Sequence, residues 1–330
     1  MADRENTVLA DLASALEEVL EPALGPVTIH NLVRLTAGAN RETWAFDADV
    51  VGERHRLILQ RDRAGVERLL GACAREADVL RCAGQHGVPV AEVIVSGGVP
   101  NPLVRSFTIN RRIEGETIAR RILRDDEWVS ARASFVEDCA QAMAKIHHIN
   151  TDALNHVELE LIEDSLTLLF GTYVALDDPQ PAFDLGFRWL DQHRPDPLPT
   201  CLVHGDFRLG NLILDHDGLA AALDWEITHL GDPGEDLGWI CVRAWRFGGS
   251  RPVGGIGDYE PFLQAYERAS GLVVSFETLR WWEIYGTLRW GVICLQFGGD
   301  FRAGRTASVE MATIGRRVVE NAHDLMELLP

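Results

Sequence analysis

Acidic and amide side chains at short intervals between residues 204 and 226 are the strongest candidates for chemistry in this sequence. The segment reads HGDFRLGNLILDHDGLAAALDWE and sets Asp206, Asn211 and Asp224 among short apolar runs. The oxygens of Asn211 and Asp224 could hold magnesium on a triphosphate, because that ion keeps several waters and takes few protein ligands. Asp206 would be left to receive a hydroxyl proton. The pattern predicts a phosphoryl-transfer site.

A predicted hairpin would bring the two metal-binding candidates together. The runs LILD and LAAALD indicate two short strands, and Asp217-Gly218 between them is typical of a tight turn. Such a turn would place Asn211 beside Asp224. Asp, Asn and Gly also occur wherever a chain bends, but that alternative does not require this order or these intervals.

Length and composition indicate an independent globular protein of about two domains. The chain has 330 residues, of which 46% are hydrophobic and 25% charged. Its acidic start lacks the features of a signal peptide, and no apolar run approaches the length of a membrane span. The six cysteines form no CxxC pair. We therefore expect reduced core cysteines, a cytoplasmic protein and no membrane partner.

The net charge of −19 argues against a nucleic-acid partner. Acidity also favours solubility, so it does not by itself identify a ligand. The sign reverses locally in a cluster of six arginines, Arg105, Arg111, Arg112, Arg120, Arg121 and Arg124. An anionic ligand or a solvated helix face would each explain part of this cluster.

The elements before residue 115 indicate a small α+β lobe. Apolar residues from Leu9 to Leu20 recur at helical spacing and predict a helix that stops near Pro22. Residues 27–35, 41–50 and 56–61 read as three strands, followed by a helix over about 66–84. Residues 92–97 and 103–110 then read as two further strands. A five-stranded antiparallel sheet with a helix is the expected result.

After Gly115 the chain is predicted to be mainly helical. Residues 131–150 carry apolar positions at helical spacing, and this helix would pack under the loop that contains Asp206. His147 and His148 are adjacent, so they point to different faces and cannot form a zinc pair. His204 is interpreted as a hydrogen-bonding residue that braces the loop.

The segment resembles the catalytic loop and metal-binding strand of the kinase-like superfamily. The pattern H-x-D-x-x-x-x-N followed by a metal-binding Asp falls on His204, Asp206, Asn211 and Asp224. Gly205 and the Asp-Trp-Glu motif are similar to the aminoglycoside phosphotransferase family, as is GDPGEDLGWI at 231–240. Within it, the sequence resembles the kinase-like domains attached to some acyl-CoA dehydrogenases.

The resemblance implies a two-lobed protein-kinase-like fold, with a nucleotide-binding lobe at 1–112 and a catalytic, acceptor-binding lobe at 113–330. It also implies ATP and Mg²⁺ as cofactors. Gly38 and Asn40 would lie in the turn that covers the phosphates. The connector from Asn110 to Ile113, including Arg111 and Arg112, would hold adenine through its backbone.

The third strand departs from the family pattern. The basic residue that grips the phosphates is replaced by Gln60, which carries no charge. Arg61 follows, but successive strand residues face opposite sides of a sheet. Glu76 matches the acidic partner of the missing cation. We therefore expect Arg61 or Arg63 to meet Glu76 or the phosphates, unless Glu76 is simply an exposed helix residue.

By the same resemblance, Asp206 orients the acceptor hydroxyl and takes its proton, and Arg208 contacts the γ-phosphate. Asn211 and Asp224 hold magnesium, with Glu226 nearby. Asp236 is expected to cap the helix that follows and to tie it to the loop, and Asp232 could share that bracing role.

The acceptor is predicted to be a small molecule with a hydroxyl group. Two segments of the C-terminal third, with Arg243 and Arg289, suggest a hydrophobic slot suited to a hydroxylated acyl or aromatic compound, although aromatic residues at helical spacing are usually core. Their aromatic residues are Trp239, Trp245, Trp281, Trp282, Tyr285 and Trp290. Asp177, Asp178 and Asp184 could instead receive the amines of an aminoglycoside or a macrolide. Homodimer formation is left open. The alternative function is a nucleotide-binding sensor or scaffold that transfers no phosphate, because Gln60 removes a cation.

Overall fold

The structure, a computed structural model, describes residues 2–35, 41–63 and 72–330. The chain divides into two compact units. Unit 1 consists of Met1–Glu114, Asn150–Glu158 and Ala220–Glu226. Unit 2 consists of Gly115–Ile149, Leu159–Leu219 and Ile227–Pro330. The strand-rich first part and the helical remainder confirm the predicted α+β fold class.

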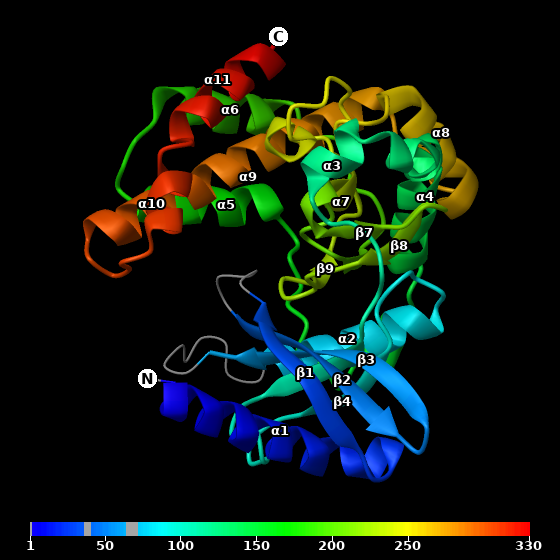
Figure 1. Cartoon of the computed structure of the whole chain (residues 1–330). Helices are drawn as coiled ribbons and strands as arrows, with labels where there is room; N and C mark the ends of the chain where they lie inside the picture. Colours follow the sequence, from blue (N-terminus) through cyan, green and yellow to red (C-terminus); the bar gives the residue numbers. More distant parts are fainter. Residues whose placement is uncertain (1, 36–40, 64–71) are drawn as a thin grey trace. The chain divides into compact units, whose positions relative to one another are not determined.

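Unit 1 is built on a five-stranded antiparallel sheet of order β1-β2-β3-β5-β4 (Figure 1). Its helices and strands are α1 (Ala2–Leu24), β1 (Thr28–Leu35), β2 (Arg41–Val50), β3 (Glu53–Asp62), α2 (Ala72–Gln85), β4 (Val93–Gly97) and β5 (Phe107–Arg111). β5 is shorter than the predicted strand over 103–110. The two long central strands β2 and β3 form an uninterrupted register from Arg41↔Asp62 to Val50↔Glu53.

Helix α1 covers one face of this sheet. Leu12, Leu16 and Leu20 recur at helical spacing and are buried against side chains of β2, β3 and β5. The helix stops near Pro22 as predicted, since Pro22 lies in its last turn and α1 ends at Leu24. Proline lacks a backbone N–H and its ring clashes with the preceding turn, so a helix rarely continues far beyond it.

The sheet has two functionally different faces. Leu57 and Leu59 of β3 point into the α1 core and are fully buried. Side chains alternate along a strand, so Gln60 and Asp62 point to the opposite face. Helix α2 begins on that side: the Asp62 carboxylate accepts the backbone N–H of Cys73 at 3.4 Å. The face that carries Gln60 is therefore the α2 face.

Unit 2 is mainly helical and includes the strands β6 (Cys201–Val203) and β9 (His229–Gly231), which pair antiparallel. β7 (Leu212–Leu214) and β8 (Leu219–Ala222) form the predicted hairpin, with Gly218 in its turn at φ 144°. The α-helices of this part of the chain are α3 (Ala119–Arg124), α4 (Val129–His147), α5 (Ser165–Ala175), α6 (Pro181–Gln192), α7 (Gly234–Trp239), α8 (Tyr259–Ser270), α9 (Phe276–Arg302), α10 (Val309–Gly315) and α11 (Val318–Leu328). The short 3-10 turns are η2 (Asp126–Trp128), η3 (Thr151–Leu154), η4 (Leu209–Asn211) and η5 (Arg243–Arg246), of which η3 belongs to unit 1.

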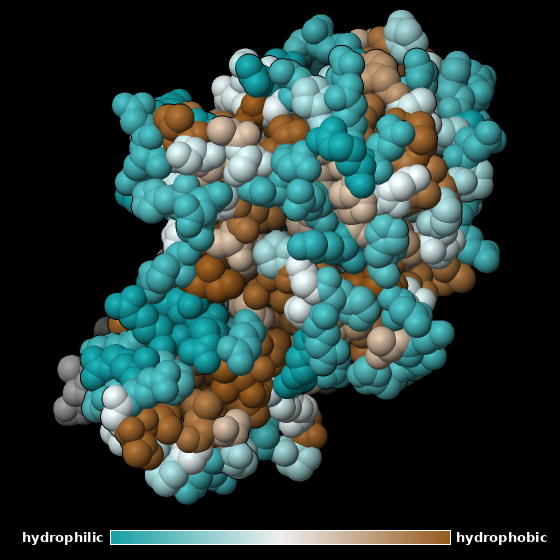
Figure 2. Space-filling model, turned by 90° about the vertical axis from the view of Figure 1, so that its right-hand side faces the viewer, coloured by the Kyte–Doolittle hydropathy of each residue, from teal (hydrophilic) through white to brown (hydrophobic). Residues whose placement is uncertain are grey.

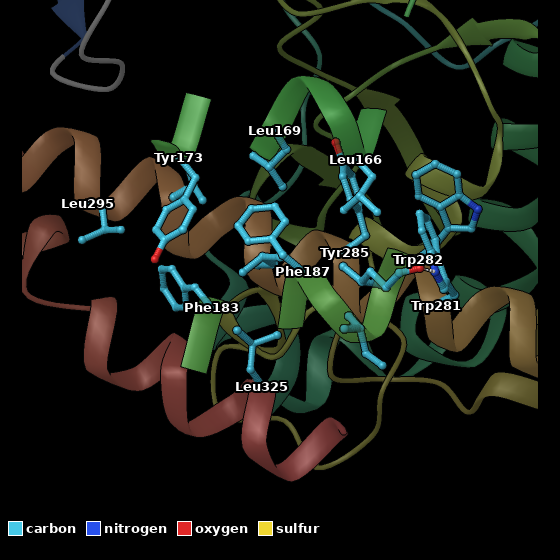
Figure 3. Close-up of a cluster of buried hydrophobic side chains, with 14 residues drawn as sticks. Leu166, Leu169, Tyr173, Phe183, Phe187, Trp281, Trp282, Tyr285, Leu295 and Leu325 are labelled. Atoms are coloured by element: carbon cyan, nitrogen blue, oxygen red, sulfur yellow. Dashed lines mark hydrogen bonds between the residues drawn. The ribbon is translucent and has the colours of Figure 1, made fainter. Parts of the chain in front are cut away.

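The aromatic residues of the C-terminal third are mostly core. Trp281, Trp282 and Tyr285 on α9 pack with residues of α5, α6 and α11 in one buried cluster (Figure 3). Trp239, Trp245 and Trp290 form a second buried cluster. The helical spacing of these residues thus reflects packing rather than a ligand slot. All six cysteines are also buried and free, as predicted.

The surface in Figure 2 mixes hydrophilic side chains with hydrophobic patches between them. Isolated exposed hydrophobic residues such as Val51 and Val309 are ordinary for a globular protein. Within the described ranges, the helices include none with the length and apolar character of a membrane span.

Candidate active site

The loop that carries Asp206 connects β6 to β7 in unit 2. β6 is tied to β9 by the pairing of Val203 with His229, which fixes the start of the loop. Gly205 has φ 83°, and a Cβ there would lie 2.9 Å from the carbonyl oxygen of Ile227. Both the left-handed conformation and the close approach of Ile227 require glycine. The turn aims the following residue, Asp206, away from the strand.

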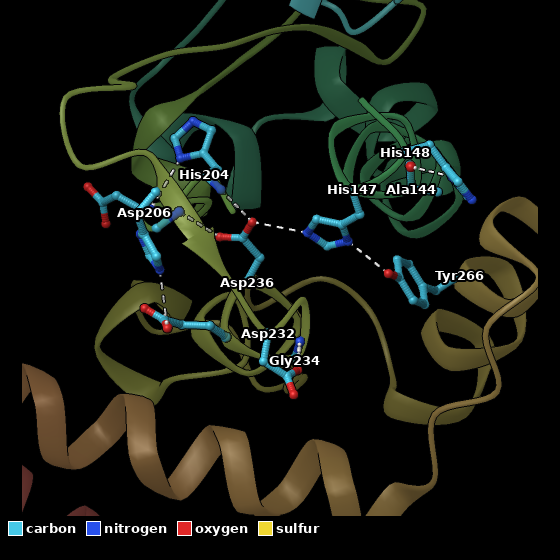
Figure 4. Close-up of polar contacts among 12 residues, drawn as sticks. Ala144, His147, His148, His204, Asp206, Asp232, Gly234, Asp236 and Tyr266 are labelled. Atoms are coloured by element: carbon cyan, nitrogen blue, oxygen red, sulfur yellow. Dashed lines mark hydrogen bonds and ion pairs between the residues drawn. The ribbon is translucent and has the colours of Figure 1, made fainter. Parts of the chain in front are cut away.

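Asp236 of α7 braces this loop from below (Figure 4). Its carboxylate accepts the backbone N–H of His204 at 2.8 Å and that of Gly205 at 2.9 Å. His147 contacts the same carboxylate at 3.2 Å through Nε2, and its Nδ1 lies 2.7 Å from the Tyr266 hydroxyl. Burial alone would raise the pKa of Asp236, but His147 and the loop contacts lower it. A charged carboxylate therefore holds the loop.

The predicted tie between α7 and the loop is confirmed at Asp236, although this residue is not the N-cap of the helix. The residue lies inside the first turn of α7 and binds the loop rather than its own helix. Asp232 has the helix-end role instead, because its carboxylate accepts the N–H of Gly234 at 2.8 Å and that of Leu198 at 2.9 Å. His204 is fully buried, and its Nδ1 lies 3.2 Å from the backbone N of Asp206. This contact agrees with the bracing role predicted for His204.

Three side chains converge on the Asp206 carboxylate. Arg208 Nε donates to Oδ1 at 2.9 Å, Trp239 Nε1 donates to Oδ1 at 2.7 Å, and Asn211 Nδ2 donates to Oδ2 at 2.6 Å. The Arg208 guanidinium also lies 4.5 Å from the ring centroid of Trp245. The structure thus brings together three of the predicted residues, Asp206, Arg208 and Asn211. Trp239 was not predicted as a site residue.

Arg289 contacts the loop and the Trp239 ring rather than the Asp206 carboxylate itself. Its Nη1 donates to the carbonyl oxygen of Gly205 at 3.1 Å and lies 3.3 Å from Glu235 Oε1. Its guanidinium lies 4.7 Å from the centroid of the Trp239 ring. The prediction that Arg289 anchors a ligand in a hydrophobic slot was therefore wrong, because its charge is used inside the core. Arg243 is an exposed residue that pairs with Asp324 at 3.2 Å.

In unit 1, Glu76 of α2 holds the Asp-Trp-Glu motif. Glu76 Oε1 accepts the backbone N–H of Trp225 at 2.9 Å, and Oε2 pairs with the guanidinium of Arg41. Arg75 adds a second tie, because its Nη2 donates to the carbonyl oxygen of Glu226 at 3.0 Å. Glu76 is only 3% exposed, which excludes the alternative of a solvated helix residue. Asp224 itself has φ 65°, a conformation that Asp tolerates better than most residues.

The expectation that Arg61 or Arg63 meets Glu76 was wrong, since Arg41 occupies that role. Arg61 points to the other face of the sheet and pairs with its cross-strand partner Glu42 at 3.1 Å. Arg63 is exposed just after β3. Nothing in the sequence singled out Arg41, because it belongs to a different strand from the missing cation.

The predicted adenine connector is partly a strand. Asn110 and Arg111 belong to β5, and the Asn110 carboxamide oxygen accepts the hydroxyl of Thr108 at 2.8 Å. The backbone N–H of Arg111 donates to Glu92 at 2.8 Å and that of Arg112 to Arg56 at 2.9 Å. These two donors are thus already used within the protein. A base-binding role for residues 110–113 stays a prediction, and Gly38 and Asn40 lie outside the described residues.

The other charged clusters are largely paired. Arg105 pairs with Glu42, Arg111 with Glu92, Arg112 with Glu114 and Arg121 with Glu116, so ion pairing explains much of the arginine cluster. Of the acidic stretch, Asp178 pairs with Arg302, and Asp184 accepts the Tyr173 hydroxyl. These contacts weaken the prediction of an amine-binding acidic stretch.

The donor chemistry of the predicted metal ligands fits magnesium. Asn211 and Asp224 offer amide and carboxylate oxygens, the hard ligands that Mg²⁺ prefers. Asn211 belongs to unit 2 and directly precedes β7, whereas Asp224 belongs to unit 1 and follows β8. Among the described residues, no group of three or more His, Cys, Asp or Glu side chains forms a metal site. This finding does not test Asn211 and Asp224, whose assignment as metal ligands stays a prediction.

The chain is similar to a known enzyme family and to parts of two larger proteins. A model described as the phosphotransferase enzyme family matches residues 31–282. Acyl-CoA dehydrogenase family member 10 of Mus musculus is 31% identical over 248 residues, which cover 68% of this chain and 23% of that protein. Acyl-CoA dehydrogenase family member 11 of Mus musculus is 42% identical over 180 residues, 51% of this chain and 22% of that protein. The matches thus span less than a quarter of these relatives.

Solved structures show the same fold. A candidate aminoglycoside phosphotransferase of Ralstonia eutropha has a TM-score of 0.72 at 22% identity, covering 96% of this chain and 97% of that one. A macrolide 2'-phosphotransferase of Brachybacterium faecium has a TM-score of 0.63 at 16% identity, covering 94% and 98%. The matches confirm the predicted kinase-like fold and the resemblance to domains found in acyl-CoA dehydrogenase proteins.

Proposed function

Because this chain belongs to the phosphotransferase enzyme family, we propose that it moves the γ-phosphate of ATP to a hydroxyl group of a small molecule. The observation that carries this proposal is the Asp206 carboxylate, which Arg208, Trp239 and Asn211 hold in one orientation. Phosphoryl transfer needs little covalent chemistry from the protein, so positioning and charge neutralisation are its main contributions. A fixed carboxylate beside a cation supplies both.

In the proposed reaction, the acceptor oxygen bonds to the γ-phosphorus while the bond to the bridging oxygen of ADP breaks. Asp206 orients the acceptor hydroxyl and takes its proton. Arg208 neutralises charge on the transferred group. Asn211 and Asp224 are proposed to hold Mg²⁺, which neutralises charge on the phosphates when it is bound.

A cavity of about 510 Å³ in unit 2 favours an acceptor with an anionic group. Three arginines contribute to its lining, Arg124 of α3, Arg132 of α4 and Arg251, and none of the described residues that line it is acidic. Arg132 donates to the carbonyl oxygens of Ile122 and Asp125, and Arg251 lies 3.5 Å from Asp258. Arg124 is exposed and has no ion pair among the described residues. In a chain with net charge −19, this is a local positive surface.

The cavity is connected to the catalytic loop through Phe247. Phe247 lines the cavity, and its ring lies 3.2 Å from the position that a Cβ on Gly210 would occupy. An acceptor anchored by its anionic end in the cavity would extend along Phe247 toward this loop. The arginines disfavour a polycationic aminoglycoside. We therefore favour a hydroxylated acyl or aromatic metabolite that carries a carboxylate or phosphate.

The function is tested by ADP release with ATP and Mg²⁺ over a panel of hydroxylated carboxylates, hydroxylated phosphate esters, aminoglycosides and macrolides. Turnover with an anionic acceptor would support the full proposal. Turnover with the antibiotics alone would retain the kinase and contradict the acceptor class. Nucleotide binding with no phosphorylated product from any compound would favour the sensor or scaffold instead.

Paired arginine variants sharpen the test of the cavity. Arg124→Gln combined with Arg251→Gln should raise the KM for an anionic acceptor roughly tenfold, because charge-assisted hydrogen bonds to the anion are lost. The KM for ATP should stay unchanged. Arg120→Gln is the matched control, since Arg120 is exposed on the same helix and does not line the cavity. Equal acceptor KM values in both variants would contradict the cavity assignment.

A further inference from the structure

The missing cation of β3 has a counterpart on the neighbouring strand. Directly opposed residues of an antiparallel pair share a face of the sheet. Arg41 opposes Asp62, and Thr43 opposes Gln60, so all four residues lie on the α2 face. Arg41 and Gln60 are diagonal neighbours there. A cation placed at residue 41 instead of residue 60 therefore stays on the same face, whereas Arg61 lies on the opposite one.

Arg41 is buried and incompletely bonded. It is 7% exposed, and one guanidinium nitrogen, Nη1, pairs with Glu76. Within the part of the chain that the structure describes, Nε and Nη2 have no hydrogen-bond acceptor, although Nη2 forms an ion pair with Glu226 Oε2 at 3.6 Å, beyond hydrogen-bond range. Buried N–H groups of an arginine are normally all bonded. Two unused donors on a buried cation indicate an oxygen-rich anionic partner.

The surroundings agree with a phosphate as that partner. Glu76, Glu226 and Asp224 all raise the pKa of Arg41 against the opposing effect of burial, so the guanidinium is charged and close to the Asp-Trp-Glu motif. Glu76 binds Arg41 through one oxygen and the Trp225 backbone through the other. The guanidinium is thus fixed relative to Asp224, the proposed metal ligand. A planar donor group held in this way suits phosphate oxygens.

We infer that Arg41 is the phosphate-binding cation of this chain, and that the basic position has moved from β3 to β2. This inference rests on the proposed function and assigns a binding residue within it. In the nucleotide complex, Nε and Nη2 of Arg41 donate to oxygens of the nucleotide phosphates. Glu76 is the positioning residue that holds the guanidinium.

The first experiment measures the affinity for ADP and for a non-hydrolysable ATP analogue, each with Mg²⁺, by calorimetry on the full chain. Arg41→Gln should weaken binding roughly 10- to 100-fold, because it removes two charge-assisted hydrogen bonds. Arg54→Gln is the matched control. Arg54 lies in the same sheet and pairs with Asp49 on the surface. It should bind nucleotide like the wild type.

A double variant that returns the positive charge from residue 41 to residue 60 gives the decisive test. Arg41→Gln combined with Gln60→Arg places a guanidinium at the diagonal position on the same face, opposite Glu76. It should recover at least roughly tenfold of the lost affinity. Gln60→Arg alone crowds two cations around one Glu76 and should not bind nucleotide more tightly than the wild type. Arg41→Lys keeps the charge without the planar fork and covers the case in which Arg41→Gln fails to fold.

The outcomes separate this inference from the proposed function. Wild-type protein that binds neither nucleotide would contradict the function itself. Wild-type binding with unchanged affinity in a folded Arg41→Gln would overturn only the role of Arg41, as would a double variant no better than the single one. A loss of thermal stability in Arg41→Gln with unchanged nucleotide affinity would show a purely structural clamp and would also overturn the inference.

Discussion

Unit 1 and unit 2 each contain a buried acid that holds a functional segment by its backbone, but they complete their bonding differently. Asp236 of unit 2 accepts two loop N–H groups and contacts His147, so the partners of this carboxylate all come from the protein. Glu76 of unit 1 accepts one N–H and pairs with Arg41, whose Nε and Nη2 find no hydrogen-bond acceptor among the residues that the structure describes. The difference separates a structural brace from a site that a ligand completes.

The physical basis of this distinction is the cost of an unbonded polar group. Leaving a buried donor without an acceptor costs about 1–3 kcal/mol. On a buried cation, an anionic ligand that supplies the acceptors would offset this cost. The Asp236 brace should therefore contribute to stability with or without nucleotide, whereas the Arg41–Glu76 pair should gain from nucleotide.

The largest effect is expected at Asp206, which lies on the loop that Asp236 holds. Asp206→Asn should lower turnover roughly 10²- to 10⁴-fold, the usual contribution of a positioned acid or base. Nucleotide affinity should change little, because the carboxylate is assigned to the acceptor. Steady-state kinetics with a confirmed acceptor, together with nucleotide calorimetry, would measure both. Near-full turnover would remove Asp206 from its proposed role.

Removing the charge of Asp236 should destabilise the fold. Asp236→Asn is expected to lose about 2–4 kcal/mol of unfolding free energy in urea, since hydrogen bonds to a charged group contribute about 1.5–3 kcal/mol each. The nucleotide-induced rise in Tm should remain. Asp232→Asn is the control: burial raises the pKa of Asp232, so neutralising it should cost less. If the two variants lost equal unfolding free energy, the charge of Asp236 would have no special role in holding the loop.

A smaller effect is expected from one donor to Asp206. Trp239→Phe removes the indole N–H that lies 2.7 Å from Oδ1 and should lower turnover roughly tenfold, or about 1.4 kcal/mol. Trp290→Phe is a matched control, because Trp290 Nε1 has no hydrogen-bond acceptor among the described residues. The Trp290→Phe variant should turn over acceptor at the wild-type rate. If both variants lose activity equally, packing rather than the hydrogen bond explains the change.

The smallest effect concerns pH. Burial would lower the pKa of His229, but Glu235 and the Ile227 carbonyl raise it above its usual value. Protonated His229 therefore stabilises the fold fully below its unfolded pKa of about 6.5, and this contribution is lost as pH rises through the folded value. Urea unfolding between pH 5.5 and 8.5 should show it. His229→Gln should flatten this part of the profile, and an unchanged slope would contradict the assignment.

Local patterns in the sequence predicted much of unit 2's loop and unit 1's sheet. The turn at Asp217-Gly218, the strand alternation and the H-x-D-x-x-x-x-N order each depend on neighbours within a few residues, so they can be read directly. The core role of the aromatic residues on α9 was one of two interpretations that helical spacing allowed. Only packing of α5, α6 and α11 against them decided it.

By itself, the sequence determined the family, the sheet and the order of Asp206, Asn211 and Asp224 along the chain. Tertiary structure alone decided that Arg41 meets Glu76, that Arg61 does not, and that Trp239 and Arg289 serve the loop. The reason is sequence separation. Arg41 and Glu76 are 35 residues apart and Trp239 and Asp206 are 33 apart, so no local pattern links them, and their contacts arise only when strands, helices and loops pack together.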